Sequence, residues 1–336
     1  MKFTITSTAT FAATIAAIML AGCNTAAHDA GERPVAANVQ LDTPQAEGWA
    51  LVWSDEFDGD TLDRSKWLPE ESCWGGANDE RQCYTDRPEN VEVSGGMLRL
   101  KARPERFTGA SRPPELRDTN EPMETRPYTS GKVRTRGLHA WKYARVDIRA
   151  KPVAGQGAWP ALWMMPDGDA YGRWPLSGEI DILETVNLGA KCSECAGDVG
   201  ENRTVSALHY GDVSPGNEHV AKASHLPDLS LPSDDFHTFS VEWGAGLIRF
   251  FVDGRPHFEV TPDQWWSAAK ATKSRPAAPF DQPFYLMANL AVGGNWPENV
   301  NERGIDATAF PSEFTIDWVR VYQCTKDRDT GRACMD

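Results

Sequence analysis

Three carboxylic acids stand within six residues of an otherwise apolar, β-branched segment, Gly178-Glu-Ile-Asp-Ile-Leu-Glu184. Such alternation of acidic and apolar residues is typical of a β-strand with one buried face. In a regular strand Glu179 and Asp181 share a face, whereas Glu184 points to the other one. All three carboxylates meet only if a β-bulge near Leu183 absorbs one residue. We therefore expect a bulged strand that carries three neighbouring acids.

Aligned carboxylates repel one another, and proteins tolerate that cost mainly where shifted pKa values serve a function. The alternative interpretation is a strand whose acids are simply hydrated. Hydrolysis of a glycosidic bond requires two carboxyl groups in different protonation states. Asp181, between the other two acids, would raise the pKa of the neighbour that must hold a proton. The spacing therefore favours a glycosidase site over a solvated strand.

The overall charge restricts the class of partner. The chain has 48 acidic and 34 basic residues, a formal charge of −14 at pH 7, which repels nucleic acid and anionic lipid headgroups. We expect no nucleic-acid partner. A substrate that is a neutral polymer fits this negative net charge better than a polyanion does. Thirteen of the 336 residues are tryptophans, so aromatic surface remains available after a core is built.

The N-terminal residues predict export. Lys2 precedes an apolar stretch from Phe11 to Leu20, which is the length of a signal-peptide core and too short to span a bilayer. Leu20-Ala-Gly-Cys23 resembles the bacterial lipoprotein cleavage box, with a cysteine in a discarded leader as the alternative. We expect residues 1–22 to be a lipoprotein signal peptide and residues 23–47 a flexible tether. Acylation of Cys23 would anchor the protein to the bacterial cell envelope, on its periplasmic or cell-surface side.

The remaining cysteines predict disulfides. Their number is even and the chain is expected to be exported, but six cysteines allow 15 pairings. The pairs that close the shortest loops are Cys73–Cys83, Cys192–Cys195 and Cys324–Cys334. Cys192-Ser-Glu-Cys195 resembles half of a zinc site, but no second Cys or His pair has matching spacing, so the disulfide is favoured.

Beyond residue 47 the chain is a series of short runs with period-two alternation, separated by Gly, Pro, Asn and Asp. Leu247–Arg255 ends at an Asp-Gly turn and resumes at His257–Val260, which predicts a hairpin. Only Asp263–Lys270 has a helical pattern. We predict one all-β domain over residues 48–325, an antiparallel sandwich or barrel, followed by a tail at 326–336. The other expected strands are 97–102, 131–136, 143–149, 204–210, 237–243, 284–290 and 314–322.

From Trp53 to Gln323 the sequence resembles the laminarinase-like members of glycoside hydrolase family 16. The resemblance rests on the acidic strand and on ordered matches elsewhere, namely Asp55-Glu-Phe57, Asn78-Asp-Glu-Arg-Gln-Cys-Tyr-Thr85, Tyr128-Thr-Ser-Gly-Lys-Val-Arg-Thr135, Gly155-Gln-Gly-Ala-Trp-Pro-Ala-Leu-Trp163, Asn289-Leu-Ala-Val-Gly-Gly-Asn-Trp296 and Ile316-Asp-Trp-Val-Arg-Val-Tyr322. It implies a β-jelly-roll sandwich of two curved antiparallel sheets, the concanavalin A-like lectin/glucanase fold. It also implies an open cleft on the concave face and a retaining mechanism.

The resemblance assigns a role to each acid. Glu179 matches the nucleophile, Glu184 the acid/base and Asp181 an assisting acid. The extra residue Leu183 is similar to the bulged motif of laminarinases, whereas a strictly alternating motif belongs to mixed-linkage lichenases. No cofactor is required. Glu56, Gly96 and Asp317 fall where the family often binds a structural calcium.

Six further residues match substrate-binding positions of the family. Indole rings can cover the apolar face of glucose, so Trp159, Trp163 and Trp174 are candidate sugar platforms, although a single Trp more often packs in a core. We assign Trp49, Trp67 and Trp318 to packing. The polar candidates are Asn78, Arg134 and His209. Their alternative roles are a loop cap for Asn78, a surface charge for Arg134 and a structural hydrogen bond for His209.

These observations predict a monomeric endo-β-1,3-glucanase that acts on laminarin-type glucans. Mixed-linkage glucan or a galactan such as agarose is an alternative substrate, and a noncatalytic β-glucan-binding protein is an alternative of another class. The segment between Asn187 and His209, with two of the cysteines, is longer than expected for a simple laminarinase. It could reshape a subsite, so linkage preference is less constrained than the reaction.

Overall fold

The computed structural model describes residues 47–335. The predicted signal peptide, the predicted lipidation site at Cys23 and almost all of the predicted tether lie outside these residues. Within the described part of the chain, no helix is long and apolar enough to cross a membrane.

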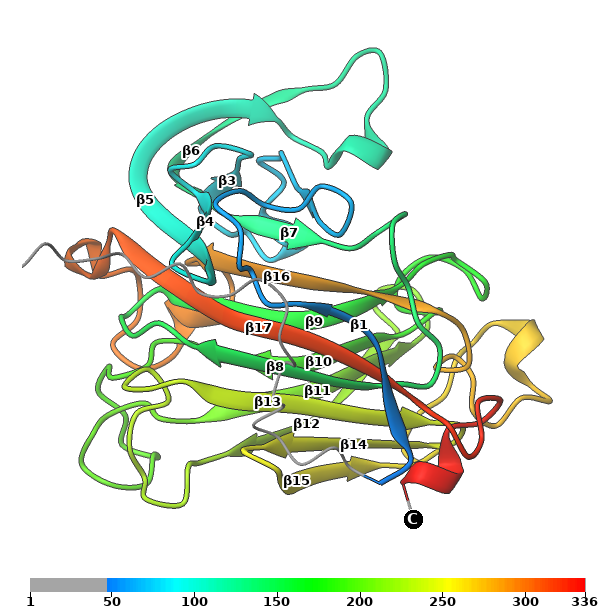
Figure 1. The fold of residues 1–336 in the computed structure, drawn as a ribbon. Coiled ribbons are helices and arrows are strands. Elements are labelled where there is room, and N and C mark those ends of the chain that lie inside the picture. The colour runs from blue at the N-terminus through cyan, green and yellow to red at the C-terminus, as the bar shows by residue number, and fades with distance from the viewer. Residues whose placement is uncertain (1–46, 336) are drawn as a thin grey trace, which may run out of the picture. The chain divides into compact units, whose positions relative to one another are not determined.

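The described residues form two stacked sheets, which confirms the predicted all-β sandwich (Figure 1). The ten-stranded sheet follows the order β15-β14-β13-β8-β17-β5-β6-β3, with β1 beside β17 and β4 beside β5. Its strands are β1 (Trp49–Asp55), β3 (Gln82–Tyr84), β4 (Val91–Ser94), β5 (Met97–Ala110), β6 (Met123–Ser130), β8 (Arg145–Lys151), β13 (His237–Gly244), β14 (Leu247–Val252), β15 (Arg255–Val260) and β17 (Ser312–Cys324).

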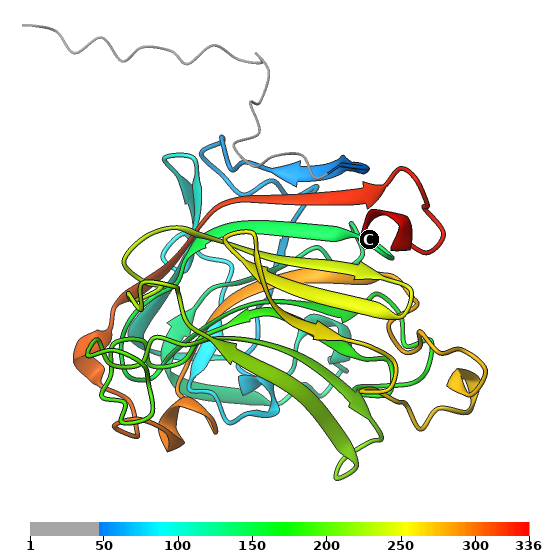
Figure 2. The same cartoon turned by 90° about the horizontal axis from the view of Figure 1, so that it is seen from below.

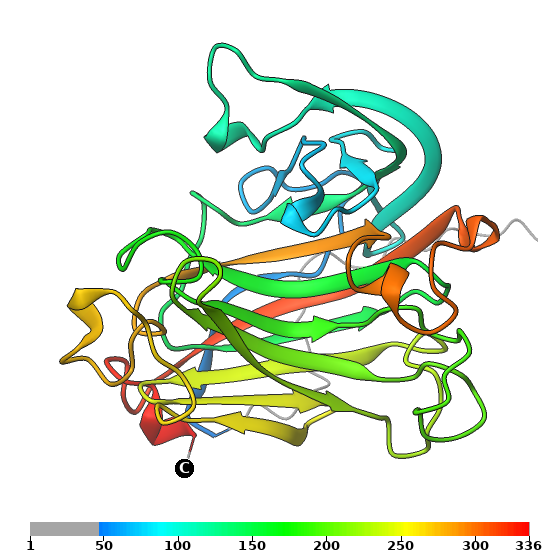
Figure 3. The ribbon, with the colours of Figure 1, turned by 180° about the vertical axis from the view of Figure 1, so that it is seen from behind.

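The seven-stranded sheet lies behind the first and faces the viewer in Figure 3. Its order is β12-β11-β10-β9-β16-β7-β2. The strands are β2 (Leu68–Pro69), β7 (Lys132–Arg134), β9 (Ala158–Pro166), β10 (Glu179–Glu184), β11 (Thr204–Gly211), β12 (Asn217–Ser224) and β16 (Phe284–Val292). Every strand pair in this sheet is antiparallel. We call the face that points away from the core the site face.

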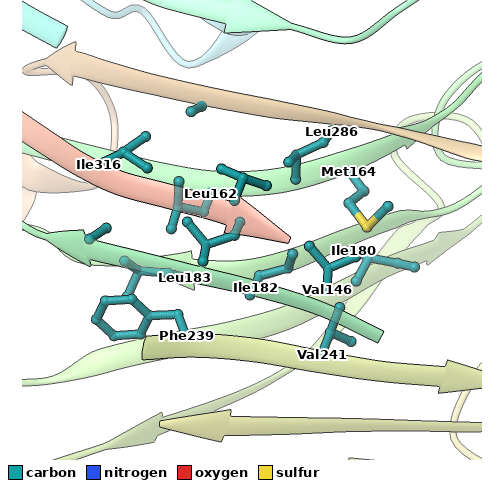
Figure 4. Packing of buried hydrophobic residues seen from close by; sticks show 14 of the residues in the cluster. Val146, Leu162, Met164, Ile180, Ile182, Leu183, Phe239, Val241, Leu286 and Ile316 are labelled. Carbon is teal, nitrogen blue, oxygen red and sulfur yellow. The ribbon is translucent and has the colours of Figure 1, made fainter. Parts of the chain in front are cut away.

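The core fills the space between the two sheets, as Figure 4 shows for its centre. Leu162 and Ile180 of the seven-stranded sheet are fully buried, and so are Val146 and Phe239 of the ten-stranded sheet. Burial of each such side chain stabilises the fold by roughly 1.5–3 kcal/mol. Because alternate residues of β9 and β10 are committed to this core, their neighbours must point to the site face.

The predicted hairpin is confirmed as β14 and β15, but the helix predicted at Asp263–Lys270 is wrong. The backbone there is used to extend the end of β11: Gly211 donates to the carbonyl of Trp266 and accepts from the amide of Ala268. The described helices are all short 3-10 turns: η1 (Gly75–Ala77), η2 (Pro114–Leu116), η3 (Lys270–Thr272), η4 (Pro297–Asn299), η5 (Ala307–Ala309) and η6 (Arg332–Cys334).

The strand expected at 97–102 is much longer in the structure. β5 continues to Ala110 and pairs with β6, so that the two form an arched hairpin whose tip carries η2 (Figure 1). Residues beyond Ala102 alternate between exposed and half-buried, because they lie past the edge of the core. Seen from below, the stacked layers of the sandwich are visible edge-on (Figure 2).

The three short-loop disulfides are present: Cys73–Cys83, Cys192–Cys195 and Cys324–Cys334. The sulfurs of Cys192 and Cys195 are bonded to each other, so they do not form half of a zinc site. Near the C-terminus, Met335 is buried against Trp49. Part of the predicted tail at 326–336 therefore packs on the domain.

Candidate active site

The expected bulge is present in β10. On β9, Asp181 pairs with Trp163 and Leu183 pairs with the preceding residue, Leu162, so β10 has one extra residue between them. Ile182 and Leu183 are both buried in the core. The extra residue returns Glu184 to the face that Asp181 occupies. The bulge therefore places Glu179, Asp181 and Glu184 on the site face.

Glu184 is half-buried on the site face. Its Oε1 accepts a hydrogen bond of 3.0 Å from Nε1 of Trp159. Burial raises the pKa of Glu184 to about 7, and the negative charge of Glu179 adds to this effect. The positive charge of His209 and the hydrogen bond from Trp159 act in the opposite direction. Glu184 can therefore hold or release a proton near neutral pH.

Asp181 is only 2% exposed and lies between the other two acids. Burial and then the charge of Glu179 raise the pKa of Asp181 well above its ordinary value. His209 Nε2, from β11, lies 3.3 Å from Asp181 Oδ2. Burial alone would lower the pKa of His209, but the bond to Asp181 outweighs it and the value rises to about 10. The Asp181–His209 pair therefore keeps at least one proton at neutral pH.

Glu179 is half-buried, like Glu184, whereas Asp181 is buried. Nε1 of Trp174 donates a hydrogen bond to its Oε2. Polar atoms of Glu179, Asp181 and His209 all lie within 4.8 Å of one another. One face of β10 thus presents two half-buried carboxyl groups, Glu179 and Glu184, and Glu184 can hold a proton near neutral pH. That is the pair of groups required to cleave a glycosidic bond.

The three candidate tryptophans lie near the acids, but they differ in exposure. Trp174 is 40% exposed and Trp163 is half-buried, so both offer indole surface to a ligand. Trp159 is only 9% exposed and packs edge-on against Trp296 at 5.5 Å. Trp159 therefore contributes mainly its hydrogen bond to Glu184. Of the residues assigned to packing, Trp49 and Trp67 are buried, whereas Trp318 is half-buried with Arg320 against its ring.

The polar candidates lie in contrasting surroundings. Asn78 is exposed, directly after η1. Arg134 lies on the site face of β7, in the same cross-strand row as Asp181, but it is only 7% exposed. Its guanidinium forms two hydrogen bonds with Glu115, from the tip of the β5–β6 hairpin. In this structure Arg134 therefore binds Glu115 and offers little surface to a sugar.

Sequence reasoning missed a polar cluster beside Trp163. Nε1 of Trp163 donates to Oδ1 of Asn289 at 2.7 Å, and the amide of Asn289 donates to the hydroxyl of Tyr84 at 3.1 Å. Lys132 Nζ lies 5.1 Å from the centre of the Trp163 ring and 3.1 Å from Glu70. The residues of this cluster lie within the motifs on which the family resemblance rests: Tyr84, Lys132 and Asn289. Their position in those motifs was the sequence signal that could have identified them.

Comparison with known proteins agrees with this geometry. Residues 49–324 match the family model of the GH16 domain of β-porphyranases A–D. The chain belongs to glycoside hydrolase family 16.

Several proteins of this family resemble the chain closely. Over 288 residues it is 38% identical to glucan endo-1,3-beta-glucosidase A1 from Niallia circulans, which covers 83% of the chain and 39% of that relative. It is 37% identical over 291 residues to a beta-glucanase from Rhodothermus marinus, and this match covers 83% of the chain and 87% of that relative. The crystal structure of the laminarinase from Rhodothermus marinus superposes with a TM-score of 0.65 at 35% identity, over 82% of this chain and 98% of that one.

The family 16 calcium site remains a prediction. Glu56 is bound by Arg320 through two hydrogen bonds, and Asp317 is bound by Arg149. Both carboxylates are therefore neutralised by arginines. These residues fit a cation poorly, because binding would require both ion pairs to open.

The long segment after the catalytic strand of this family 16 domain packs against the loop that contains η4. Asn187 donates to the carbonyl of Pro297 at 2.9 Å, and Asn301 donates to Glu201 at 2.9 Å. Arg203 forms a bidentate pair with Glu201. The segment is thus held by buried polar contacts in addition to its disulfide.

Proposed function

We propose that this protein is a retaining endo-β-1,3-glucanase. The observation that carries the proposal is the bulge at Ile182, which places Glu184, with a pKa of about 7, on the same face as Glu179. A retaining glycosidase needs a nucleophilic carboxylate and a carboxylic acid that is protonated when the reaction starts. Glu179 and Glu184 provide these two groups.

In the first step, an Oε atom of Glu179 attacks the anomeric carbon and forms a covalent bond to the sugar. The bond from that carbon to the leaving oxygen breaks, and Glu184 donates its proton to this oxygen. The nucleophile is positioned by the hydrogen bond from Trp174, and a carboxylate oxygen of Asp181 lies within 4.8 Å of it. The products of this step are a glycosyl-enzyme and a shortened polysaccharide.

In the second step, Glu184 is ionised and accepts a proton from water. The oxygen of that water attacks the anomeric carbon, the bond to Glu179 breaks, and the enzyme returns to its starting state. Two displacements at the same carbon leave its configuration unchanged. The hydrogen bond from Trp159 stabilises the ionised form of Glu184 that this step requires.

The proposed substrate is a neutral β-1,3-glucan of the laminarin type. Relatives described as a glucan endo-1,3-beta-glucosidase and a laminarinase support this choice, and so does the net charge of −14. The chain spans only 39% of the length of the first relative, although it spans 87% of the second. The matching family model is named for β-porphyranases, which favours a galactan as the second candidate substrate. Mixed-linkage glucan is the third.

We also propose that the protein is a monomer that needs no cofactor, since the mechanism uses only carboxyl groups and water. A lipid at Cys23 would hold it at the cell envelope. Mass spectrometry of the membrane fraction of an expressing bacterium tests the anchor. A diacylglycerol adduct on an N-terminal cysteine is expected, and an unmodified soluble chain would contradict it.

The proposed function is tested by incubating the protein with laminarin, lichenan and agarose and by measuring new reducing ends. Laminarin should be cleaved fastest, and Glu179→Gln should abolish cleavage while the melting temperature stays within a few degrees. Binding of laminarin without turnover would support the noncatalytic alternative. An active Glu179→Gln variant would refute the assignment of the nucleophile.

A further inference from the structure

The site face is open on one side of β10 and covered on the other. On β12, the residues that point to this face are exposed: His219, Ala221 and Ala223. On β16, beyond β9, the corresponding residues are all at most 6% exposed: Tyr285, Met287, Asn289 and Ala291. Lys132 and Arg134 of β7 are 6% and 7% exposed. The site faces of β16 and β7 are therefore buried.

The tip of the β5–β6 hairpin lies against β7 on this side, and Tyr84 of β3, which pairs with β6, contacts Asn289 of β16. Glu115, in η2, accepts hydrogen bonds of 2.7 and 2.8 Å from the two terminal nitrogens of Arg134 and a third from Arg136. The guanidinium of Arg136 in turn lies 5.6 Å from the centre of the Tyr285 ring. We call the contacts of Glu115 with Arg134 and Arg136 the hairpin latch.

The latch has a strong energetic basis. Burial disfavours the charge on Glu115, yet Arg134 and Arg136 hold the pKa of this carboxyl below its ordinary value. Arg134 is almost fully buried, and a buried guanidinium without a carboxylate partner is costly. Its other acidic contact, with Glu70, is longer at 3.5 Å. Glu115 is therefore the principal partner of a charge that must be compensated.

Further contacts fix the hairpin over the sheet. Arg117, next to η2, donates to the backbone carbonyl of Glu71, and Arg126 on β6 donates to that of Cys73 at 3.2 Å. The disulfide between Cys73 and Cys83 joins the segment beneath the hairpin to β3. The covering layer is thus tied down at its tip and along its stem.

We propose that the β5–β6 hairpin, held by the latch, ends the substrate-binding surface on the β16–β7 side and limits how many sugars bind there. From β10 toward β7, the half-buried Trp163 and Met165 of β9 are the last partly exposed residues before the buried site faces of β16 and β7, roughly one strand spacing of ~5 Å from β10. In the opposite direction, partly exposed surface continues through the half-buried His209 of β11 to the exposed His219 of β12. The hairpin therefore makes the site asymmetric, with a short side whose length fixes the size of the released fragment.

This inference rests on the proposed function, because it concerns the same site. The substitution that tests it is Glu115→Lys, which places a positive charge against Arg134 and Arg136 and should expel the tip. Glu124→Lys is the matched control. Glu124 lies on β6 of the same hairpin and pairs with Arg126 at an exposed position, so the change in charge is identical while the latch stays intact.

Two measurements are made on the wild type and both variants. Hydrogen–deuterium exchange at residues 111–121 reports opening of the tip without any need for activity. Cleavage of β-1,3-linked oligosaccharides labelled at the reducing end reports which bond is cut. We expect Glu115→Lys to accelerate exchange at least tenfold and to lengthen the shortest abundant fragment by one or more sugars. Glu124→Lys should match the wild type in both measurements.

Unchanged exchange in Glu115→Lys would overturn the latch. Accelerated exchange with an unchanged cleavage pattern would overturn the limit on substrate length. If the wild type cleaves lichenan or agarose instead of laminarin, the proposed linkage fails, while the hairpin is still tested with oligosaccharides of that polymer. If no polymer is cleaved, the proposed function fails and the exchange measurement alone decides the latch.

Discussion

The indole nitrogen of Trp159 donates a hydrogen bond of 3.0 Å to Glu184, the carboxyl group proposed as the acid/base. The proposed nucleophile, Glu179, receives a hydrogen bond from another indole, that of Trp174. Each reacting carboxyl is therefore oriented by one tryptophan. In Trp159, which is almost completely buried, this polar role replaces the sugar-stacking role expected from the sequence.

Replacing Trp159 with Phe should move the alkaline limb of the pH–activity profile upward. The wild type should lose activity as the pH rises through about 7, because Glu184 must start the reaction protonated. The indole hydrogen bond favours the ionised carboxylate, so its loss raises the pKa of Glu184. Measurement of kcat/KM between pH 4 and 10 checks this. Trp163→Phe, which removes a bond to Asn289, should leave the limb in place.

Glu184→Gln should stabilise the folded protein at alkaline pH. The folded pKa of about 7 lies above the ordinary value of 4.5, so the folded state binds this proton more tightly than the unfolded state. The resulting penalty is absent below about pH 4.5, grows as the pH rises, and is complete above about 7. A gain of ~1–3 kcal/mol at pH 8, and almost none at pH 4, is expected from denaturant unfolding. An equal effect at both pH values would contradict the raised pKa of Glu184.

His209→Gln should act on both stability and the pH profile. The pKa of His209 is raised from 6.5 to about 10 in the folded state, so its charge stabilises the fold fully below about pH 6.5 and loses this effect as the pH rises through about 10. The variant should lose ~1–3 kcal/mol at pH 6 and less at pH 10. Its alkaline activity limb should shift upward, because the positive charge no longer lowers the pKa of Glu184. His219→Gln, at an exposed position opposite His209 on β12, should change neither the stability nor the alkaline limb.

Deletion of Leu183 should preserve the orientation of the three acids. Without this residue the strand alternates strictly, so Glu179, Asp181 and Glu184 still share a face. The loss of a buried leucine should cost about 2–5 kcal/mol. Deletion of Ile180, equally buried, places Glu179 on the core face. The Leu183 deletion should therefore keep measurable laminarin cleavage, whereas the Ile180 deletion should keep none; the opposite order would refute the role of the bulge.

Local patterns in the sequence predicted several features of the structure. The alternation in Leu247–Val260 predicted the β14–β15 hairpin, because side chains of a half-buried strand must alternate. The spacing of the acids predicted the bulge near Leu183, because Glu184 reaches the face of Asp181 in no other way. Both features depend on residues close together in the chain.

Features that depend on distant partners were not predicted. The sequence of Asp263–Lys270 has a helical pattern, but the backbone of this segment forms hydrogen bonds with Gly211, more than 50 residues earlier. Arg134 matched a sugar-binding position, and no local pattern indicated that Glu115 would occupy it. The full length of β5 was missed, because beyond Ala102 it packs on no core and has no clear hydrophobic period.

The most direct test is to trap the glycosyl-enzyme with a 2-deoxy-2-fluoro laminaribioside that has a good leaving group, followed by peptide mass spectrometry. The fluorine slows both displacements, and the leaving group lets the first step proceed without an acid. The mechanism predicts that the sugar is attached to Glu179, in the wild type and in Glu184→Gln. Attachment to Glu184, or rapid turnover with no covalent adduct on either residue, would contradict it.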